Sequence, residues 1–127
     1  MADRIADFKD LNSWKEAHKL VLLIYLESKK FPKDEIYGIT SQMRRAVVSI
    51  TSNIAEGFGR QSFKEKVHFY HIAQGSLIEL KNQIEIVHDI GYIPDATYGI
   101  LTEQANSSHR LLQGLIRKSK EIHNSHS

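Results

Sequence analysis

The chain has 127 residues, of which 41% are hydrophobic and 25% are charged, an ordinary composition for one globular domain with a sizeable core. It contains no cysteine, which excludes a disulfide framework and a thiolate metal site. The net charge of +2 is lower than a dedicated nucleic-acid binder usually carries. The longest apolar run, Leu20–Leu26, is too short to span a bilayer, and the first residues lack the apolar segment of a signal peptide. We therefore expect a cytoplasmic protein that has no membrane partner.

Helical periodicity dominates the chain, and no segment alternates with the period of a β-strand. Two prolines, Pro32 and Pro94, lie between long periodic segments. Capping and stop signals predict four helices, over Ser13–Lys29, Asp34–Phe58, Ser62–Ile90 and Asp95–Ile122. Because the connections are short, successive helices should be antiparallel neighbours. The sequence thus predicts an all-α, up-down-up-down four-helix bundle. It should form a single domain, 1–127, with a core over about 8–122 and a disordered tail at 123–127.

The second predicted helix carries its polar residues on one side. On a wheel of about 100° per residue, these side chains occupy an arc of roughly 100°: Gln42, Arg45, Ser49, Ser52, Asn53, Glu56 and Arg60. Most of the remaining circumference is apolar or small, which is wider than a helix needs when it packs only within its own monomer. This breadth favours self-association.

The polar arc has two interpretations. Side chains three or four positions apart can hydrogen-bond along a helix, so Arg45, Ser49, Asn53 and Glu56 could form a buried structural network that fixes register between helices or subunits. Alternatively, arginine forks could meet phosphate, and the candidates for nucleic-acid contact are Arg44, Arg60 and Lys64. A third possibility is that these polar side chains form an ordinary exposed surface without a structural or binding role.

Several segments together resemble a known family: "LNSWKEA", "KFPKDEIYGI", "QMRRAVVSITSNIAEGFGR", "HFYHIAQGSLIELKNQIEI" and "GYI". Their succession, over roughly 8–116, is similar to the bacterial four-helix bundle proteins encoded in 23S ribosomal RNA intervening sequences. That family is in turn similar to the accessory variability proteins of diversity-generating retroelements. The resemblance implies a bundle, a homopentameric ring, and a role near structured RNA or a nucleic-acid enzyme.

The family pattern falls on two helices of this chain. On the second predicted helix it matches Gln42, Met43, Arg44, Arg45, Ser49, Asn53, Ile54, Ala55, Glu56, Gly57 and Arg60. On the third it matches Phe69, Ala73, Gly75, Ser76, Glu79, Leu80 and Gln83. Gly75 lies inside a helix, where alanine would be better by about 1 kcal/mol, so we expect another helix to approach closely there.

Enzyme signals are weak. Two Glu-x-x-His motifs, Glu65–His68 and Glu85–His88, have the spacing of di-iron ligands in helical bundles. Both lie on the same predicted helix, about 30 Å apart at a rise of about 1.5 Å per residue, so they cannot share a metal centre. No phosphate-cradling loop and no nucleophile with an evident base is present. We therefore predict no catalytic residue, no metal and no cofactor. Two functions remain: a homo-oligomeric, nucleic-acid-associated module, or a protein-interaction scaffold without nucleic-acid contact.

Overall fold

A computed structural model describes residues 5–125, and within them every regular element is helical. Four α-helices make up the fold: α1 (Asn12–Ser28), α2 (Ile39–Phe58), α3 (Phe63–Asp89) and α4 (Asp95–Ser125). Two short 3₁₀ turns, η1 (Phe8–Asp10) and η2 (Lys33–Glu35), precede α1 and α2. The predicted all-α class is confirmed for the part of the chain that the structure describes.

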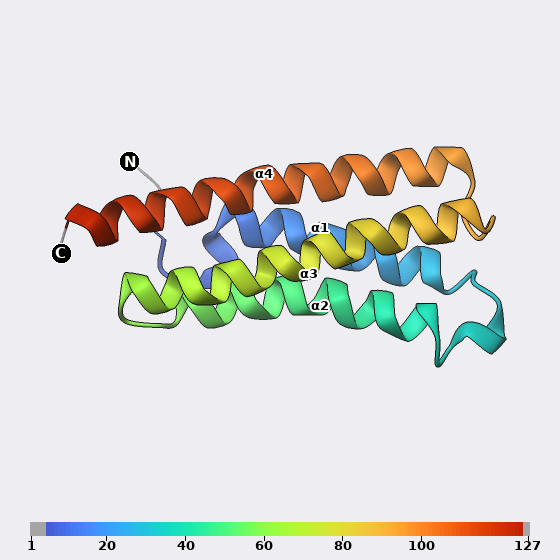
Figure 1. Cartoon of the computed structure of the whole chain (residues 1–127), viewed down its shortest axis with the longest axis horizontal. Coiled ribbons are helices and arrows are strands. Elements are labelled where there is room, and N and C mark those ends of the chain that lie inside the picture. The colour runs from blue at the N-terminus through green and yellow to red at the C-terminus, as the bar shows by residue number, and fades with distance from the viewer. Residues whose placement is uncertain (1–4, 126–127) are drawn as a thin grey trace.

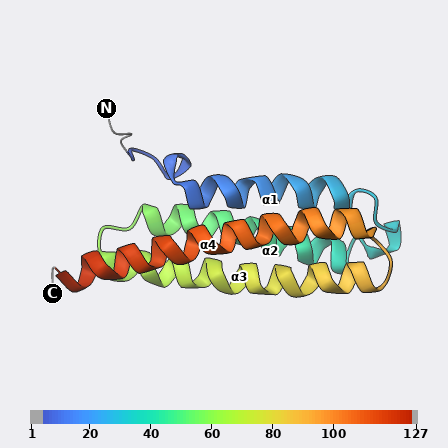
Figure 2. The ribbon, with the colours of Figure 1, turned by 90° about the horizontal axis from the view of Figure 1, so that it is seen from above.

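The four helices lie lengthwise beside one another (Figure 1). Each helix packs against two others, in the pairs α1–α2, α2–α3, α3–α4 and α4–α1. Seen from above, α1 and α3 lie on opposite sides of α4, and α2 lies behind α4 (Figure 2). The α2–α3 connection lies at the same end of the molecule as the beginning of η1 and the end of α4. The other two connections lie at the opposite end.

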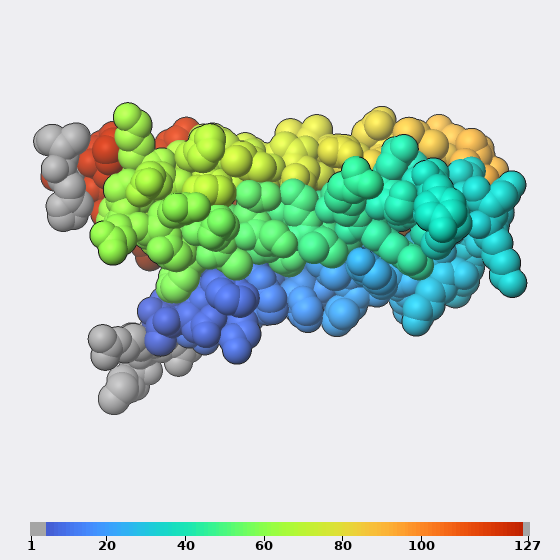
Figure 3. All heavy atoms as spheres, turned by 90° about the horizontal axis from the view of Figure 1, so that it is seen from below, coloured from blue at the N-terminus to red at the C-terminus, as the bar shows by residue number. Residues whose placement is uncertain are grey.

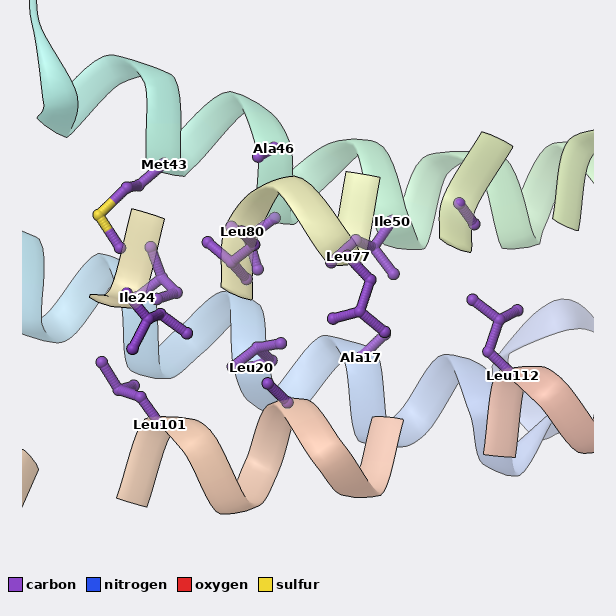
Figure 4. Close-up of a cluster of buried hydrophobic side chains, with 14 of the residues drawn as sticks. Ala17, Leu20, Ile24, Met43, Ala46, Ile50, Leu77, Leu80, Leu101 and Leu112 are labelled. Carbon is purple, nitrogen blue, oxygen red and sulfur yellow. The ribbon is translucent and has the colours of Figure 1, made fainter. Parts of the chain in front are cut away.

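The core runs along the axis between the helices, and all four contribute to it (Figure 4). Small and large side chains alternate there, as in Ala17 beside Leu20 on α1 and Ala46 beside Ile50 on α2. Leu77, Leu80, Leu101 and Leu112 from α3 and α4 point into the same space. Burial of such side chains contributes about 1.5–3 kcal/mol each, so this seam is the main source of stability.

The first two helices begin elsewhere than predicted. Asp7 caps η1, and Lys15 N–H donates to the Leu11 carbonyl at 3.0 Å, so α1 starts directly after Leu11. Ser13, the predicted first residue of this helix, is instead a buried residue inside it and does not cap it. Residues 34–38 are not part of α2 either. η2 occupies the first of them, and Gly38, with φ −111° and ψ −123°, interrupts the helical backbone before Ile39.

The later boundaries follow the predicted signals more closely. Ser62 caps α3 by accepting from Glu65 N–H at 3.1 Å. α3 ends before Gly91, whose φ of +87° is a left-handed conformation suited to glycine. α4 continues to Ser125, so residues 123–125 are helical rather than a disordered tail, while 126–127 lie outside the described residues. On α3 the core positions include Tyr70 and Leu77.

Candidate functional site

One broad surface holds most of the residues that the family resemblance singled out. α2 lies between α3 and α1 when the molecule is viewed from below (Figure 3). Helical spacing and two cross-helix contacts, Ser49 with Ser76 and Arg60 with Phe69, place the outer positions of α2 and α3 on a common side. We call this surface the α2–α3 face, and its residues are Gln42, Arg45, Ser49, Ser52, Asn53, Glu56, Arg60, Phe69, Ile72, Gly75, Ser76, Glu79 and Ile86.

A small hydrogen-bonded cluster lies in the groove between the two helices. The Ser49 and Ser76 hydroxyl oxygens are 2.8 Å apart. Asn53 Nδ2 donates to the Ser49 carbonyl at 2.8 Å and to Ser49 Oγ at 3.1 Å. Since Ser49 Oγ accepts from Asn53, its own proton is available for Ser76 Oγ. The cluster therefore ties α2 to α3 through short polar side chains.

Glu56 and Arg60 form a second contact on the same face. Arg60 Nη2 lies 3.5 Å from Glu56 Oε1, and the Arg60 guanidinium lies 4.6 Å from the centre of the Phe69 ring. The Arg60 and Glu56 side chains remain 41% and 56% exposed, so solvent screens the ion pair. The arrangement leaves part of the guanidinium open to an incoming group.

The predicted network of four residues is only half formed within one chain. Arg45 is exposed and makes no hydrogen bond or ion pair with residues 5–125. Glu56 is paired with Arg60, one of the predicted nucleic-acid contacts, rather than with Arg45 or Asn53. Ser49 is bonded to Asn53 and Ser76 instead. Burial of Arg45 and Glu56 would therefore require a second molecule. A polar network that forms between two copies of the chain stays a prediction.

The three predicted phosphate contacts do not lie together. Arg44 faces α1, where its Nε donates to Ser28 Oγ at 2.9 Å and its guanidinium lies 5.0 Å from the centre of the Tyr25 ring. Arg60 faces α3 through the Phe69 ring. Lys64 is exposed in the first turn of α3. Arg44 thus fastens α2 to α1, whereas Arg60 and Lys64 lie near the α2–α3 connection.

The α2–α3 face also exposes apolar side chains. Ile72 is 41% exposed and Ile86 is 40% exposed, and both lie on the side of α3 that turns away from the core. Gly75 lies between them along the helix. A Cβ placed at Gly75 would meet nothing within 4 Å. The expected close approach of a helix at Gly75 is therefore wrong within this chain, because α3 turns that position towards solvent.

A second candidate surface lies on α4. Between His109 and Lys120, α4 carries four cationic residues and no carboxylate, namely Arg110, Arg117, Lys118 and Lys120. All four are exposed, and Arg110 makes a hydrogen bond only to Ser107 Oγ, at 3.1 Å. We call this stretch the α4 basic segment. Its residues are visible in the sequence, but their common lack of acidic partners is not.

Lys81 on α3 adds to the positive charge beside this segment. Its Nζ lies 2.7 Å from His109 Nδ1, and Gln74 Nε2 lies 3.4 Å from His109 Nε2. Burial and the nearby Lys81 ammonium lower the pKa of His109. Burial and the Arg110 guanidinium likewise lower the pKa of Lys81. In this contact the Lys81 ammonium donates a hydrogen bond to the unprotonated Nδ1 of His109.

The two Glu-x-x-His motifs have other partners. Glu85 accepts a hydrogen bond from the Tyr98 hydroxyl at 2.6 Å, and His88 Nε2 lies 2.7 Å from Asp95 Oδ1. Across residues 5–125, no three His, Asp or Glu side chains are grouped so that they could hold a metal ion. Across the same residues, no helix combines the length and the apolar character that membrane crossing requires.

These observations define the class of protein as a helical bundle with a polar-lined α2–α3 face. A family model described as 23S rRNA-intervening sequence protein matches residues 9–114. The chain belongs to this family, which confirms the resemblance seen in the sequence. A search of the curated proteins returns no match.

One solved structure supports the fold. It is a protein with unknown function from the S23 ribosomal protein family of Bacteroides thetaiotaomicron. The two structures are similar with a TM-score of 0.76 and 20% sequence identity, over 82% of this chain and 97% of that chain. At this identity the similarity concerns the fold alone.

Proposed function

We propose that this protein is a non-enzymatic, antiparallel up-down-up-down bundle that assembles with copies of itself and associates with structured RNA. The observation that carries the RNA association is the α4 basic segment. The α2–α3 face provides the surface for self-assembly. The preferred number of five copies comes from the family resemblance.

Cross-helix contacts support the antiparallel topology. Ser49 lies beside Ser76, while Phe58, further along α2, accepts from Lys66, which comes earlier on α3. On the next pair of helices, His109 lies beside Gln74 and Asp95 beside His88. In each pair, residue numbers rise along one helix as they fall along the other.

The charges of the α4 basic segment favour a phosphate-rich partner. Elsewhere, Lys19 and Lys30 are paired with a glutamate three positions away, and Arg60 is paired with Glu56. The cations of the segment have no such carboxylate among the described residues. Phosphate contacts by exposed lysine and arginine release counterions, which is the main source of sequence-independent affinity for nucleic acid. The low net charge of the chain therefore conceals a local concentration of positive charge.

Self-assembly is favoured by the mixed character of the α2–α3 face. Interfaces between subunits combine apolar side chains with satisfied polar groups and arginine. On this face, Ile72 and Ile86 are the apolar side chains and Arg45 and Arg60 are the arginines. The Ser49–Ser76 cluster is the group of polar side chains whose hydrogen bonds are satisfied. Packing of a second copy on Gly75 would also give a physical reason for a glycine inside α3.

The alternative is a protein-interaction scaffold without direct nucleic-acid contact. Its support is the apolar surface of α1, where Leu22 and Leu26 are 58% and 54% exposed. They are four residues apart and so share one side of the helix. Such a pair favours a protein partner rather than RNA.

The experiment that separates the two functions is a titration of a fluorescent RNA hairpin, followed by anisotropy. A triple variant of α4, Arg110→Gln with Arg117→Gln and Lys120→Gln, should weaken binding at least about tenfold. Its matched control removes three exposed lysines instead, through Lys15→Gln, Lys29→Gln and Lys33→Gln, so the net charge changes equally. Equal weakening by both variants, or no binding by the unaltered protein, would favour the scaffold.

A further inference from the structure

A pocket of about 330 Å³ opens at the end of the bundle where the α2–α3 connection meets the second half of α4. Its walls are mostly apolar, and they include Leu11, Phe58, Phe63, Leu115 and Ile122. Pockets that bind small molecules begin at about 300 Å³ and combine apolar walls with a few polar groups. None of the residues predicted from the sequence as functional lies in this pocket.

Four polar side chains also line it, namely Lys66, Tyr70, Lys118 and Ser119. Tyr70 is only 2% exposed, and its hydroxyl makes no hydrogen bond with any residue of 5–125. Ser119 is 4% exposed and its hydroxyl is equally without a bond there. Neither hydroxyl oxygen is among the fully enclosed side-chain atoms that lack a partner in the described residues, so both oxygens can still be reached from the pocket. Both groups are therefore available to a bound molecule.

Lys66 places a cation beside the aromatic wall. Its Nζ donates to the Phe58 carbonyl at 2.6 Å and lies 5.2 Å from the centre of the Phe58 ring and 6.0 Å from that of Phe63. An ammonium group has three protons to donate, and the carbonyl takes one of them. No carboxylate within the described residues pairs with Lys66. An anionic group in the pocket would supply that missing partner.

The position of Tyr70 is fixed by close packing. A Cβ at Gly57 would lie 2.7 Å from Tyr70 Cε1 and 2.9 Å from Cδ1, so only glycine allows the ring to lie there. The Tyr70 hydroxyl is therefore held rigidly rather than free to turn away. Burial raises the pKa of Tyr70 to about 12, so the hydroxyl keeps its proton and can donate it.

We propose that this pocket binds a nucleotide, with its base against the aromatic wall and its phosphate at Lys66 and Lys118. The nucleotide comes either from solution or from an unpaired end of RNA. In the second case the inference rests on the proposed function. Unpaired bases stack on aromatic side chains and hydrogen-bond through their edges, while lysine meets the phosphate.

The hydroxyls of Tyr70 and Ser119 distinguish a nucleotide from a fatty acid. Both ligands combine an anion with an apolar part, and both would satisfy the two lysines. An alkyl chain, however, offers no hydrogen-bonding group to the hydroxyls of Tyr70 and Ser119, which would lose their contact with water when the chain filled the pocket. A base has polar edges that can accept from and donate to these groups.

The test is a titration of the intact protein with adenosine 5′-monophosphate, followed through the NMR signals of the Phe58 and Phe63 rings. We expect saturable shifts. Tyr70→Phe removes one neutral hydrogen bond and should weaken binding about three- to tenfold. Lys118→Gln, at an exposed position that the core does not need, should weaken it about tenfold. Lys15→Gln, which removes an exposed lysine of α1 that does not line the pocket, should leave the affinity unchanged.

Parallel titrations show whether the nucleotide comes from solution or from an RNA end. They also test the nucleotide pocket and the RNA association independently of each other. Tighter binding of a 5′-phosphorylated tetra-adenylate than of the mononucleotide would support an RNA end. Shifts with the mononucleotide but no affinity for RNA would uphold the pocket as a site for free nucleotides and refute the RNA association. Shifts with decanoate but none with the mononucleotide would overturn the nucleotide proposal. If Tyr70→Phe and Lys118→Gln bind the mononucleotide as tightly as the Lys15→Gln control, the nucleotide proposal is overturned as well.

Discussion

The ring of Tyr70 on α3 lies directly against the backbone of Gly57 on α2. A Cβ at position 57 would come within 3.1 Å of the Lys66 carbonyl oxygen as well as colliding with the ring. Neither neighbour can move easily, because one is backbone and the other is a buried aromatic ring. The contact therefore couples the end of α2 to the beginning of α3 and sets one wall of the pocket.

Gly57→Ala should destabilise the fold, although alanine is the better helix former. The propensity gain of up to about 1 kcal/mol is outweighed by overpacking, which costs about 1–3 kcal/mol. Gly75→Ala is the matched control, since nothing lies within 4 Å of its Cβ, and it should stabilise the monomer by about 0.5–1 kcal/mol. Urea unfolding of both variants measures the difference. A Gly57→Ala protein as stable as the parent would contradict the packing account.

Gly75→Leu tests the α2–α3 face as a surface between copies. Because Gly75 is exposed in the single chain, leucine there should leave the melting temperature of an isolated subunit nearly unchanged. A copy packed closely on the glycine would be pushed away, so the mass from light scattering should fall towards that of one chain. An assembly of unchanged mass would show that this part of the face is not covered by another copy.

Glu56→Gln separates an exposed ion pair from one buried between copies. In an isolated chain, the pair with Arg60 is solvent-exposed, and its removal should change the unfolding free energy by no more than about 1 kcal/mol. If assembly buries Arg45, Arg60 and Glu56 together, removal of one partner should cost about 3–5 kcal/mol and dissociate the oligomer. Thermal melting at several protein concentrations distinguishes these outcomes. A small effect that does not depend on concentration would reject the network between copies.

Acidification should weaken the α3–α4 contact through His109. The pKa of His109 is lowered from its ordinary value of 6.5 by burial and by Lys81, with Arg110 close to that lysine. The unfolded chain therefore takes up the proton more readily than the folded chain. The stabilisation is present above pH 6.5 and is lost as the pH falls below that value. Urea unfolding at pH 8 and pH 5.5 should show a smaller decrease for His109→Gln than for the parent. Identical decreases would contradict this assignment.

The fold could be predicted from the sequence because the spacing of apolar residues and the capping residues determine a helix within a few positions along the chain. Ser62 and Gly91 marked the ends of α3 correctly, since each acts within a few residues of its own position. Ser13 misled for a non-local reason. Its spacing to Glu16 is typical of a helix cap. However, η1 precedes α1 so closely that α1 already begins at Asn12, and Ser13 becomes a buried residue inside the helix.

The candidate sites were less predictable because they depend on which helices become neighbours. The polar arc of α2 was visible in the sequence, but its partner Ser76 lies 27 positions away on α3. Arg44 and Arg45 are adjacent in the chain, yet only Arg44 reaches α1. The pocket joins residues from both ends of the chain, and Tyr70 gave no signal beyond its aromatic character.

The dependence of RNA affinity on salt tests the central claim most directly. If the α4 basic segment binds phosphate, the logarithm of the binding constant should fall linearly with the logarithm of the salt concentration. The slope should become shallower by about 0.9 for each phosphate that is no longer neutralised, hence by about three in the triple variant of Arg110, Arg117 and Lys120. The variant of Lys15, Lys29 and Lys33 should keep the parental slope. A parental slope near zero, or one that the α4 variant leaves unchanged, would contradict RNA association through this segment.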